Sequence, residues 1–198
     1  DDEAKHLGRV LRKQQGEEIF VTDGEGSVYL CKINTLAKEL IDCSILEKLS
    51  SVNEPKVKIK LYQSLIKNPD RFEFAIEKAV ELGVNTVHPV ITEHVINKTT
   101  NKTERWQAIA LAAMKQSQRC VLPKIFEPVN FADAIVSANG DLKLIADEKE
   151  NDSRISIADI KDSFSTIVLF IGPEGGFTAN EAELAVSNGF KILTLGAR

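Results

Sequence analysis

One stretch of about thirty residues near the end of the printed sequence constrains the fold most. Thr166–Ile171 is a short apolar run rich in β-branched residues, which is typical of a central strand buried on both faces. It stops at the glycine-rich loop Gly172–Gly176, and Thr178 with Glu181 then forms a capping box that predicts the start of a helix. A second apolar strand follows at Lys191–Leu195. This order predicts a parallel sheet that binds a ligand at the carboxyl ends of its strands.

The glycine loop limits the kinds of ligand that fit. Its sequence, Gly172-Pro173-Glu174-Gly175-Gly176, matches neither of the two common phosphate-binding patterns, GxGxxG and GxxxxGK[ST]. Adjacent glycines let a ligand approach the main chain, while the acid Glu174 and the lack of a lysine disfavour a polyphosphate. A neutral or cationic nucleoside therefore fits better, although a tight turn without any ligand is an equally good reading of the loop alone.

The middle of the chain repeats the alternation of strands and helices. After a polar linker at Ser50–Lys56, the apolar spacing predicts these elements: a strand at Val57–Leu65, a helix from Asp70 to Gly83, a strand at Val84–Val90, a long helix at Glu104–Arg119, a short strand at Cys120–Phe126, a short helix at Phe131–Ser137, a strand at Leu142–Ala146 and a helical turn at Ile155–Ile160. Strand, helix and strand in succession favour an α/β domain with a parallel sheet.

The beginning of the chain has a different pattern. Glu17–Thr22 and Ser27–Ile33 flank Asp23-Gly24, the signal of a β-hairpin, and Lys38–Leu46 is consistent with a third strand. Short strands at short spacing predict a small β-barrel, preceded by a helical turn at His6–Arg12. We therefore expect two domains, 1–53 and 56–198.

Composition narrows the partners. The net charge is −4, but lysine and arginine outnumber acids in 56–72 and 94–124, which fits contact with RNA through one face. A solvated lysine-rich surface is the simpler alternative. The three histidines and three cysteines have no metal-ligand spacing, so no metal is expected, and reduced thiols indicate a cytoplasmic protein. No apolar run approaches the length of a membrane span.

Five blocks of sequence carry a family resemblance. Gly172–Phe177 (GPEGGF) and Leu195–Arg198 (LGAR) resemble the signature of the SPOUT methyltransferases. The blocks at His6–Arg12, Asp70–Val84 and Lys115–Arg119 match in the expected order. The closest resemblance is to the bacterial family that methylates N3 of a uridine in 16S ribosomal RNA.

That resemblance implies a trefoil-knotted parallel sheet with helices on both faces, preceded by a PUA-like barrel that often holds RNA. It implies S-adenosylmethionine as cofactor, 16S rRNA of the small ribosomal subunit as substrate, and a homodimer. The residues that would bind the cofactor are Leu144, Ile171, Gly172, Pro173, Glu174, Gly175, Gly176, Leu195, Gly196 and Arg198.

Cations are the expected contacts to RNA and to the reacting base. N3 of uracil must lose a proton before it is methylated, so a base or a cation that stabilises the anion is needed. Arg198 and Arg119 are the catalytic candidates, and no general base is assigned. The RNA-binding candidates are Arg9, Arg12, Lys13, Arg71, Lys115 and Arg119. Simpler roles are an ion pair with Asp70 or Glu73 for Arg71, and a charge at a helix end for Arg119.

One departure from the family pattern concerns the end of the chain. The family motif continues past LG-x-R, whereas this sequence ends at Arg198, so we expect part of the knot and of the cofactor floor to be missing. Two other functions stay open: methylation of another RNA position, such as a ribose 2′-hydroxyl, and RNA binding without catalysis.

Overall fold

The computed structural model describes residues 2–37, 40–50, 53–95, 102–148 and 154–196, and it divides into two compact units. The first unit contains residues 1–54 together with 118–121, and the second contains 55–117 and 122–198. The predicted domain ranges, 1–53 and 56–198, assign residues 118–121 to the second domain, and those ranges stay a prediction.

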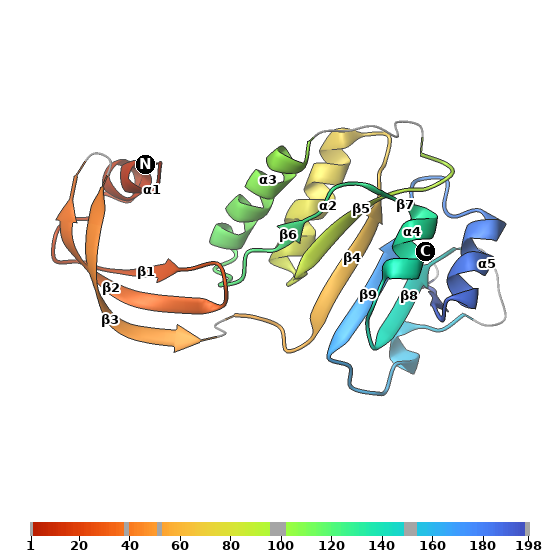
Figure 1. The fold of residues 1–198 in the computed structure, drawn as a ribbon. Coiled ribbons are helices and arrows are strands. Elements are labelled where there is room, and N and C mark those ends of the chain that lie inside the picture. The colour runs from red at the N-terminus through yellow and green to blue at the C-terminus, as the bar shows by residue number, and fades with distance from the viewer. Residues whose placement is uncertain (1, 38–39, 51–52, 96–101, 149–153, 197–198) are drawn as a thin grey trace. The chain divides into compact units, whose positions relative to one another are not determined.

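The first unit is built on an antiparallel sheet with the strand order β1-β2-β3 (Figure 1). Its elements are α1 (Asp2–Lys5), a π-helical turn (His6–Val10), β1 (Glu18–Thr22), β2 (Ser27–Leu36) and β3 (Ile41–Ser50). Asp23 closes the predicted hairpin, since its side chain accepts hydrogen bonds from the N–H groups of Glu25 and Ser27. Ile19, Cys31 and Ile33 form a small buried cluster on one face. Where strand spacing predicted a small barrel, the described residues form this three-stranded sheet.

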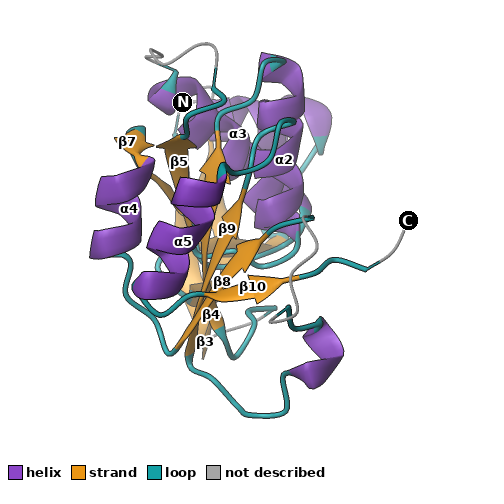
Figure 2. Cartoon of the chain, turned by 90° about the vertical axis from the view of Figure 1, so that its right-hand side faces the viewer, coloured by secondary structure: helices purple, strands orange, loops and turns teal. Residues whose placement is uncertain are grey.

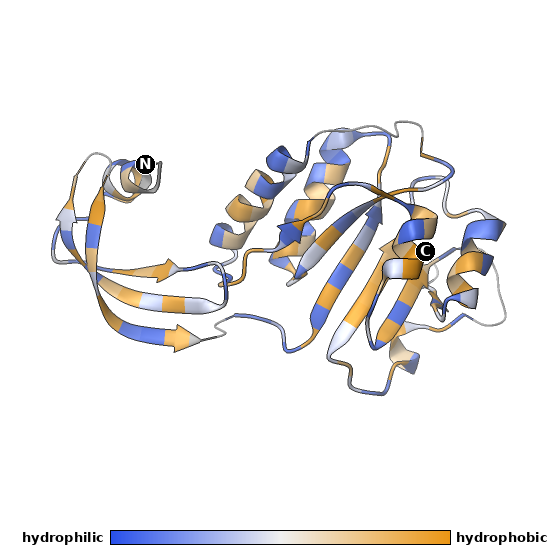
Figure 3. Cartoon of the chain, in the orientation of Figure 1, coloured by the Kyte–Doolittle hydropathy of each residue, from blue (hydrophilic) through white to orange (hydrophobic). Residues whose placement is uncertain are grey.

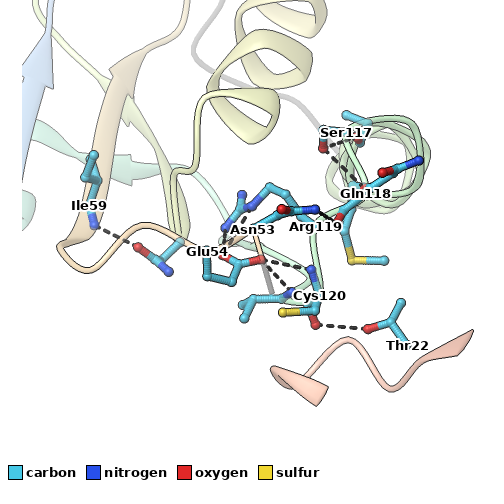
Figure 4. A network of polar contacts seen from close by, with 12 residues as sticks. Thr22, Asn53, Glu54, Ile59, Ser117, Gln118, Arg119 and Cys120 are labelled. Carbon is cyan, nitrogen blue, oxygen red and sulfur yellow. Dashed lines mark hydrogen bonds and ion pairs between the residues drawn. The ribbon is translucent and has the colours of Figure 1, made fainter. Parts of the chain in front are cut away.

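A buried carboxylate attaches the excursion 118–121 to the rest of the first unit (Figure 4). Glu54 accepts hydrogen bonds from the backbone N–H groups of Cys120 and Val121, at 2.9 and 3.0 Å. Its other oxygen lies 2.7 Å from Nη2 of Arg119. The carbonyl of Cys120 accepts the N–H of Gly26, so the excursion also contacts the β1–β2 turn. One carboxylate therefore binds three of the four residues, and the amide of Asn53 donates to the carbonyl of the fourth, Gln118.

The second unit is a wholly parallel sheet with the order β10-β8-β9-β4-β5-β6, and β7 also pairs with β5. Its elements are β4 (Lys58–Ser64), α2 (Pro69–Glu81), β5 (Thr86–Ile91), α3 (Thr103–Gln116), β6 (Lys124–Ile125), β7 (Val129–Asn130), α4 (Phe131–Ser137), β8 (Leu142–Ala146), a 3-10 turn (Ile157–Asp159), β9 (Thr166–Ile171), α5 (Ala179–Ser187) and β10 (Lys191–Leu193). The predicted α/β class is therefore confirmed.

Helices cover both faces of this sheet, as Figure 2 shows. On β4, Leu61 points toward α2 and α3, where it joins a core with Phe72 and Trp106. The next residue, Tyr62, points to the opposite face and packs in a second core with Phe170 and residues of α4 and α5. Hydrophilic and hydrophobic residues alternate along the first part of β4, whereas β9 is apolar over most of its length (Figure 3). Burial on both faces explains the apolar run of β9.

One predicted strand is largely wrong. Cys120–Phe126 was expected as a strand, but only Lys124–Ile125 pairs with β5, and β7 was not expected at all. The physical reason is that residues 118–121 make their hydrogen bonds within the first unit. Pro123 and Pro128 also lack the N–H that a continuous ladder requires. The predicted helical turn at Ile155–Ile160 is a shorter 3-10 turn.

Candidate functional site

The last residues of the central strands stand in one row across the sheet. Ala146 of β8 pairs with Leu193 of β10 on one side and with Ile171 of β9 on the other, and Ile171 pairs with Gln63 of β4. Because all these strands are parallel, the loops that follow them leave the sheet at the same edge and the same level. The backbones of β9 and β10 are separated by one strand, about 10 Å in all. This edge is the place where open α/β sheets bind ligands.

The glycine loop after β9 is held by its neighbours on the side of β4 and β5. The carboxylate of Glu174 accepts a hydrogen bond from the N–H of Lys67, in the loop after β4, at 3.3 Å. Nδ1 of His94, in the loop after β5, lies 3.1 Å from the carbonyl oxygen of Gly176. Gly176 has φ of +67°, a conformation that favours glycine, and its N–H donates to the carbonyl of Pro173. The loop is thus a tight turn fixed by two other loops.

The exit of the glycine loop is closed by aromatic packing. Phe177 is fully buried, and a Cβ atom added to Gly172 would lie only 3.2 Å from its ring. A larger residue at position 172 would therefore displace the ring that seals the loop against the core. The glycine at this position has a packing role as well as leaving the main chain accessible.

A buried acid links three segments of the site. Glu181 is 9% exposed, at the start of α5. Its Oε2 accepts the N–H of Thr178, and the Thr178 hydroxyl accepts the N–H of Glu181, which completes the predicted capping box. Its Oε1 accepts the N–H of Glu93, from the loop after β5, at 2.9 Å. One carboxylate therefore joins α5, the end of the glycine loop and the loop after β5.

The predicted cofactor residues fall into three groups. Leu144 and Ile171 are strand residues whose side chains pack in hydrophobic clusters, so they can offer only main-chain groups to a ligand at the edge. The glycine loop lies at the edge, with Glu174 exposed. Leu195 is 70% exposed and Gly196 has φ of +97°, both just after β10 at the same edge. Arg198 lies outside the described residues.

The predicted RNA-binding residues are scattered. Arg9 and Arg12 are exposed in the first unit, and Lys13 forms an exposed ion pair with Glu17 at 3.3 Å. In the second unit, Arg71 is exposed on the first turn of α2, and Lys115 is exposed near the end of α3. Their contact with RNA stays a prediction.

Arg119 is in a different environment from the other predicted RNA contacts. Its side chain is 2% exposed and forms an ion pair with Glu54, whose side chain is 8% exposed. Nε of Arg119 contacts the same carboxylate at 3.3 Å. The ion pair thus gives Arg119 a structural role within the first unit, and its role toward RNA or in catalysis stays a prediction.

The loop after β5 also belongs to this edge, and it was not predicted from the sequence. His94 contacts the glycine loop, and the N–H of Glu93 donates to Glu181 near the start of α5. The signal that could have found them is their position, because they directly follow a strand that runs parallel to β9.

The described residues contain neither a group of side chains suited to a metal ion nor a helix suited to a membrane. Its His, Cys, Asp and Glu side chains do not gather in any group of three that could hold a metal ion. Among the same residues, no helix is long and apolar enough to cross a membrane.

Family models match both parts of the chain. An RNA methyltransferase domain matches residues 53–198, and an RNA methyltransferase PUA domain matches residues 1–46. The parallel sheet with its loops at one edge, preceded by the antiparallel unit, thus has the architecture of the two-domain RNA methyltransferases.

Individual relatives narrow the family further. The chain is 37% identical to ribosomal RNA small subunit methyltransferase E of Synechocystis, over 98% of this chain and 64% of that protein. It is 39% identical to the protein of the same name from Mesomycoplasma hyopneumoniae, over 91% of this chain and 78% of that protein. A crystal structure of the Neisseria gonorrhoeae enzyme bound to S-adenosyl methionine superposes with a TM-score of 0.88 at 33% identity, covering 100% of this chain and 82% of that one.

The chain belongs to the ribosomal RNA small subunit methyltransferase E family. The resemblance inferred from the five sequence blocks is thereby confirmed. The knot that it implies depends on the C-terminal end, where residues 197 and 198 lie outside the described residues.

Proposed function

We propose that this protein transfers a methyl group from S-adenosylmethionine to N3 of a uridine in 16S rRNA of the small ribosomal subunit. The observation that carries the proposal is the common row in which β8, β9 and β10 end, with a glycine loop after β9 and Leu195-Gly196 after β10. The names of the relatives support the class of substrate. The choice of N3 rests on the family resemblance of the five sequence blocks.

The residues at this edge fit the cofactor. A nucleoside with a cationic sulfonium needs main-chain donors and acceptors for its adenine and no cluster of lysines around it. At Gly176 an added Cβ atom would meet nothing within 4 Å, so side chains leave the main chain open there, and exposed Glu174 supplies a negative charge nearby. We infer that Gly172–Gly176 and Leu195-Gly196 hold the adenine end, with the main chain of Leu144 and Ile171 behind them. When bound, S-adenosylmethionine supplies an electrophilic methyl group.

The protein's own contribution is alignment and charge. In-line displacement requires the uracil to approach from one direction, so the rigid loops around Gly176 act by orienting the two reactants. Lys67 and Arg71 both follow β4 and are exposed at the same edge of the sheet. We assign them to the phosphates beside the target uridine and to the negative charge that develops on the deprotonated base. The target must be unpaired or flipped out, because pairing blocks N3.

The same proposal covers assembly and location. Leu195 is exposed beside the cofactor edge, so a second copy that packs over it would bury apolar surface. We propose a homodimer on this basis, testable by analytical ultracentrifugation. We also propose a cytoplasmic location, because the proposed substrate is ribosomal RNA.

Calorimetry with S-adenosylmethionine tests the cofactor site. Gly176→Ala places a side chain at φ of +67° without a clash, and strain of about 1 kcal/mol should distort the loop. Gly189→Ala is the matched control, because Gly189 has φ of +83° and equal space but precedes β10 at the opposite edge. We expect G176A alone to weaken cofactor binding. Equal affinity for both variants would contradict the proposed site.

A further inference from the structure

Four aromatic rings stack in a row across the second unit's sheet. Phe170 of β9, Tyr62 of β4 and His88 of β5 lie parallel, with centroid separations of 4.3 Å for each neighbouring pair and interplanar angles of 7° and 6°. Phe126, directly after β6, extends the row with a separation of 4.2 Å and an angle of 9°. The strands β9, β4, β5 and β6 are neighbours in this order (Figure 1), so the row follows the sheet from its core to its edge.

We call the row of Phe170, Tyr62, His88 and Phe126 the aromatic ladder, and its two ends lie in different environments. Phe170 is fully buried beneath α4 and α5, where Phe131 and Phe190 meet it edge-on. Phe126 is only partly buried, and β6 is the last strand of the described sheet. The ladder therefore ends in a ring at an open edge. The glycine loop follows β9, and Phe126 follows β6 three strands away, about 15 Å across the sheet, so we do not assign this ring to the cofactor site.

Two lysines lie on the same face of the sheet, each two residues before a ring of this row: Lys60 before Tyr62, and Lys124 before Phe126. Lys60 and Lys124 both pair with Thr86 across the sheet, one strand on each side of it, so their backbones are about 10 Å apart. Nζ of Lys124 lies 4.6 Å from the ring centroid of Phe126, and Nζ of Lys60 donates to the carbonyl of Asn139, which leaves it two further N–H groups.

The local field at the ladder is positive. Burial is the main cause that lowers the pKa of His88 to about 4, and the charges of Lys60 and Lys124 add to it. The ring is therefore neutral near pH 7 and stacks without a charge of its own. The acid nearest in sequence, Glu127, is held by the Thr103 hydroxyl at 2.8 Å.

We propose that this corner is a second RNA contact, at which an unpaired nucleobase stacks on Phe126 and its flanking phosphates bind Lys60 and Lys124. An aromatic ring supplies sequence-tolerant stacking, and lysines on the same face neutralise backbone charge, which is the combination that single-stranded nucleic acid requires. The inference rests on the proposed function in taking RNA as the partner. It adds a contact three strands away from the glycine loop, which would fix the register of the substrate.

Binding of a fluorescently labelled single-stranded RNA decamer to the full chain, measured by anisotropy over a salt series, tests this contact. Phe126→Leu removes the stacking surface and should weaken binding about 5-fold or more without changing the salt dependence. Lys124→Ala should lower the slope of log affinity against log salt by about 0.7, because one phosphate contact is lost. Melting temperatures of both variants establish that the fold is intact.

The chain provides a matched control on α2. Lys78 lies 5.5 Å from the ring centroid of exposed Phe74, a similar pair, but it is bonded to Glu77 and Glu81. Phe74→Leu and Lys78→Ala should leave RNA affinity unchanged. The inference is overturned if F126L and K124A bind RNA as tightly as the wild-type protein. It is also overturned if the wild-type protein binds no RNA. If F126L weakens RNA binding but the wild-type protein transfers no methyl group, the proposed function is refuted and this RNA contact is supported.

Discussion

Replacing Glu181 by alanine removes the carboxylate that joins α5, the end of the glycine loop and the loop after β5 at the candidate site. The carboxylate accepts the N–H of Thr178 within its capping box and the N–H of Glu93 from the loop after β5. Loss of the cap costs about 1 kcal/mol, and loss of the second acceptor costs about 1 kcal/mol or more, because a part-buried donor loses its partner. We therefore expect E181A to lower the free energy of unfolding of the second unit by about 2 kcal/mol.

The assay is urea unfolding followed by the fluorescence of Trp106, which is the one tryptophan of the sequence and is buried in the same unit. A slope of about 1.5 kcal/mol per molar urea converts the loss into a midpoint shift of about 1.3 M. Glu183→Ala is the control, because Glu183 is exposed on the same helix, and its effect should stay within about 0.5 kcal/mol. Equal midpoints for E181A and E183A would refute this account of the joint.

Two further predictions concern buried polar groups. Glu54→Ala leaves the buried guanidinium of Arg119 without this carboxylate and should destabilise the first unit by about 3 kcal/mol, whereas Glu17→Ala in the exposed pair with Lys13 should cost less than about 1 kcal/mol. Hydrogen exchange of the β2 amides measures both effects. Similar protection in the two variants would contradict the claim that removing one partner costs more in the buried pair than in the exposed pair. For His88, the pKa of about 4 in the folded protein lies below the ordinary value of 6.5, so between these values the unfolded chain binds more protons. The free energy of unfolding should be highest above about pH 6.5 and should decrease as the pH falls toward 4. The full pKa shift corresponds to about 3 kcal/mol, and the decrease should be smaller because the ring is partly open to solvent. His88→Phe should flatten this part of the pH profile, and an unchanged profile would show that His88 is not its source.

Local sequence signals predicted most of the second unit. The capping box of Thr178 and Glu181 and the N-cap of α2 at Asn68, followed by Pro69, involve neighbours in the chain, so sequence shows them directly. Continuous apolar runs predicted buried strands because both faces of the sheet are covered. The order of those strands, with β8 between β9 and β10, depends on crossovers that no local pattern encodes.

The contacts that sequence could not predict join residues far apart in the chain. Arg119 read as a basic helix end suited to RNA, yet Glu54, 65 positions earlier, pairs with it in a buried site. The hydrogen bond from the N–H of Glu93 to the carboxylate of Glu181 spans 88 positions, and it brings the loop after β5 into the candidate site. Such pairs follow from tertiary packing, where one charged group determines the environment of another. The aromatic ladder was missed for the same reason, since each strand contributes a single ring.

The central claim is that this protein methylates N3 of a uridine in small-subunit rRNA. The most direct measurement is mass spectrometry of nucleosides from 16S rRNA, purified from cells with the gene, without it, and with it restored on a plasmid. The account predicts that N3-methyluridine disappears on deletion and returns with the plasmid copy. An unchanged amount of N3-methyluridine in the deletion strain would contradict it.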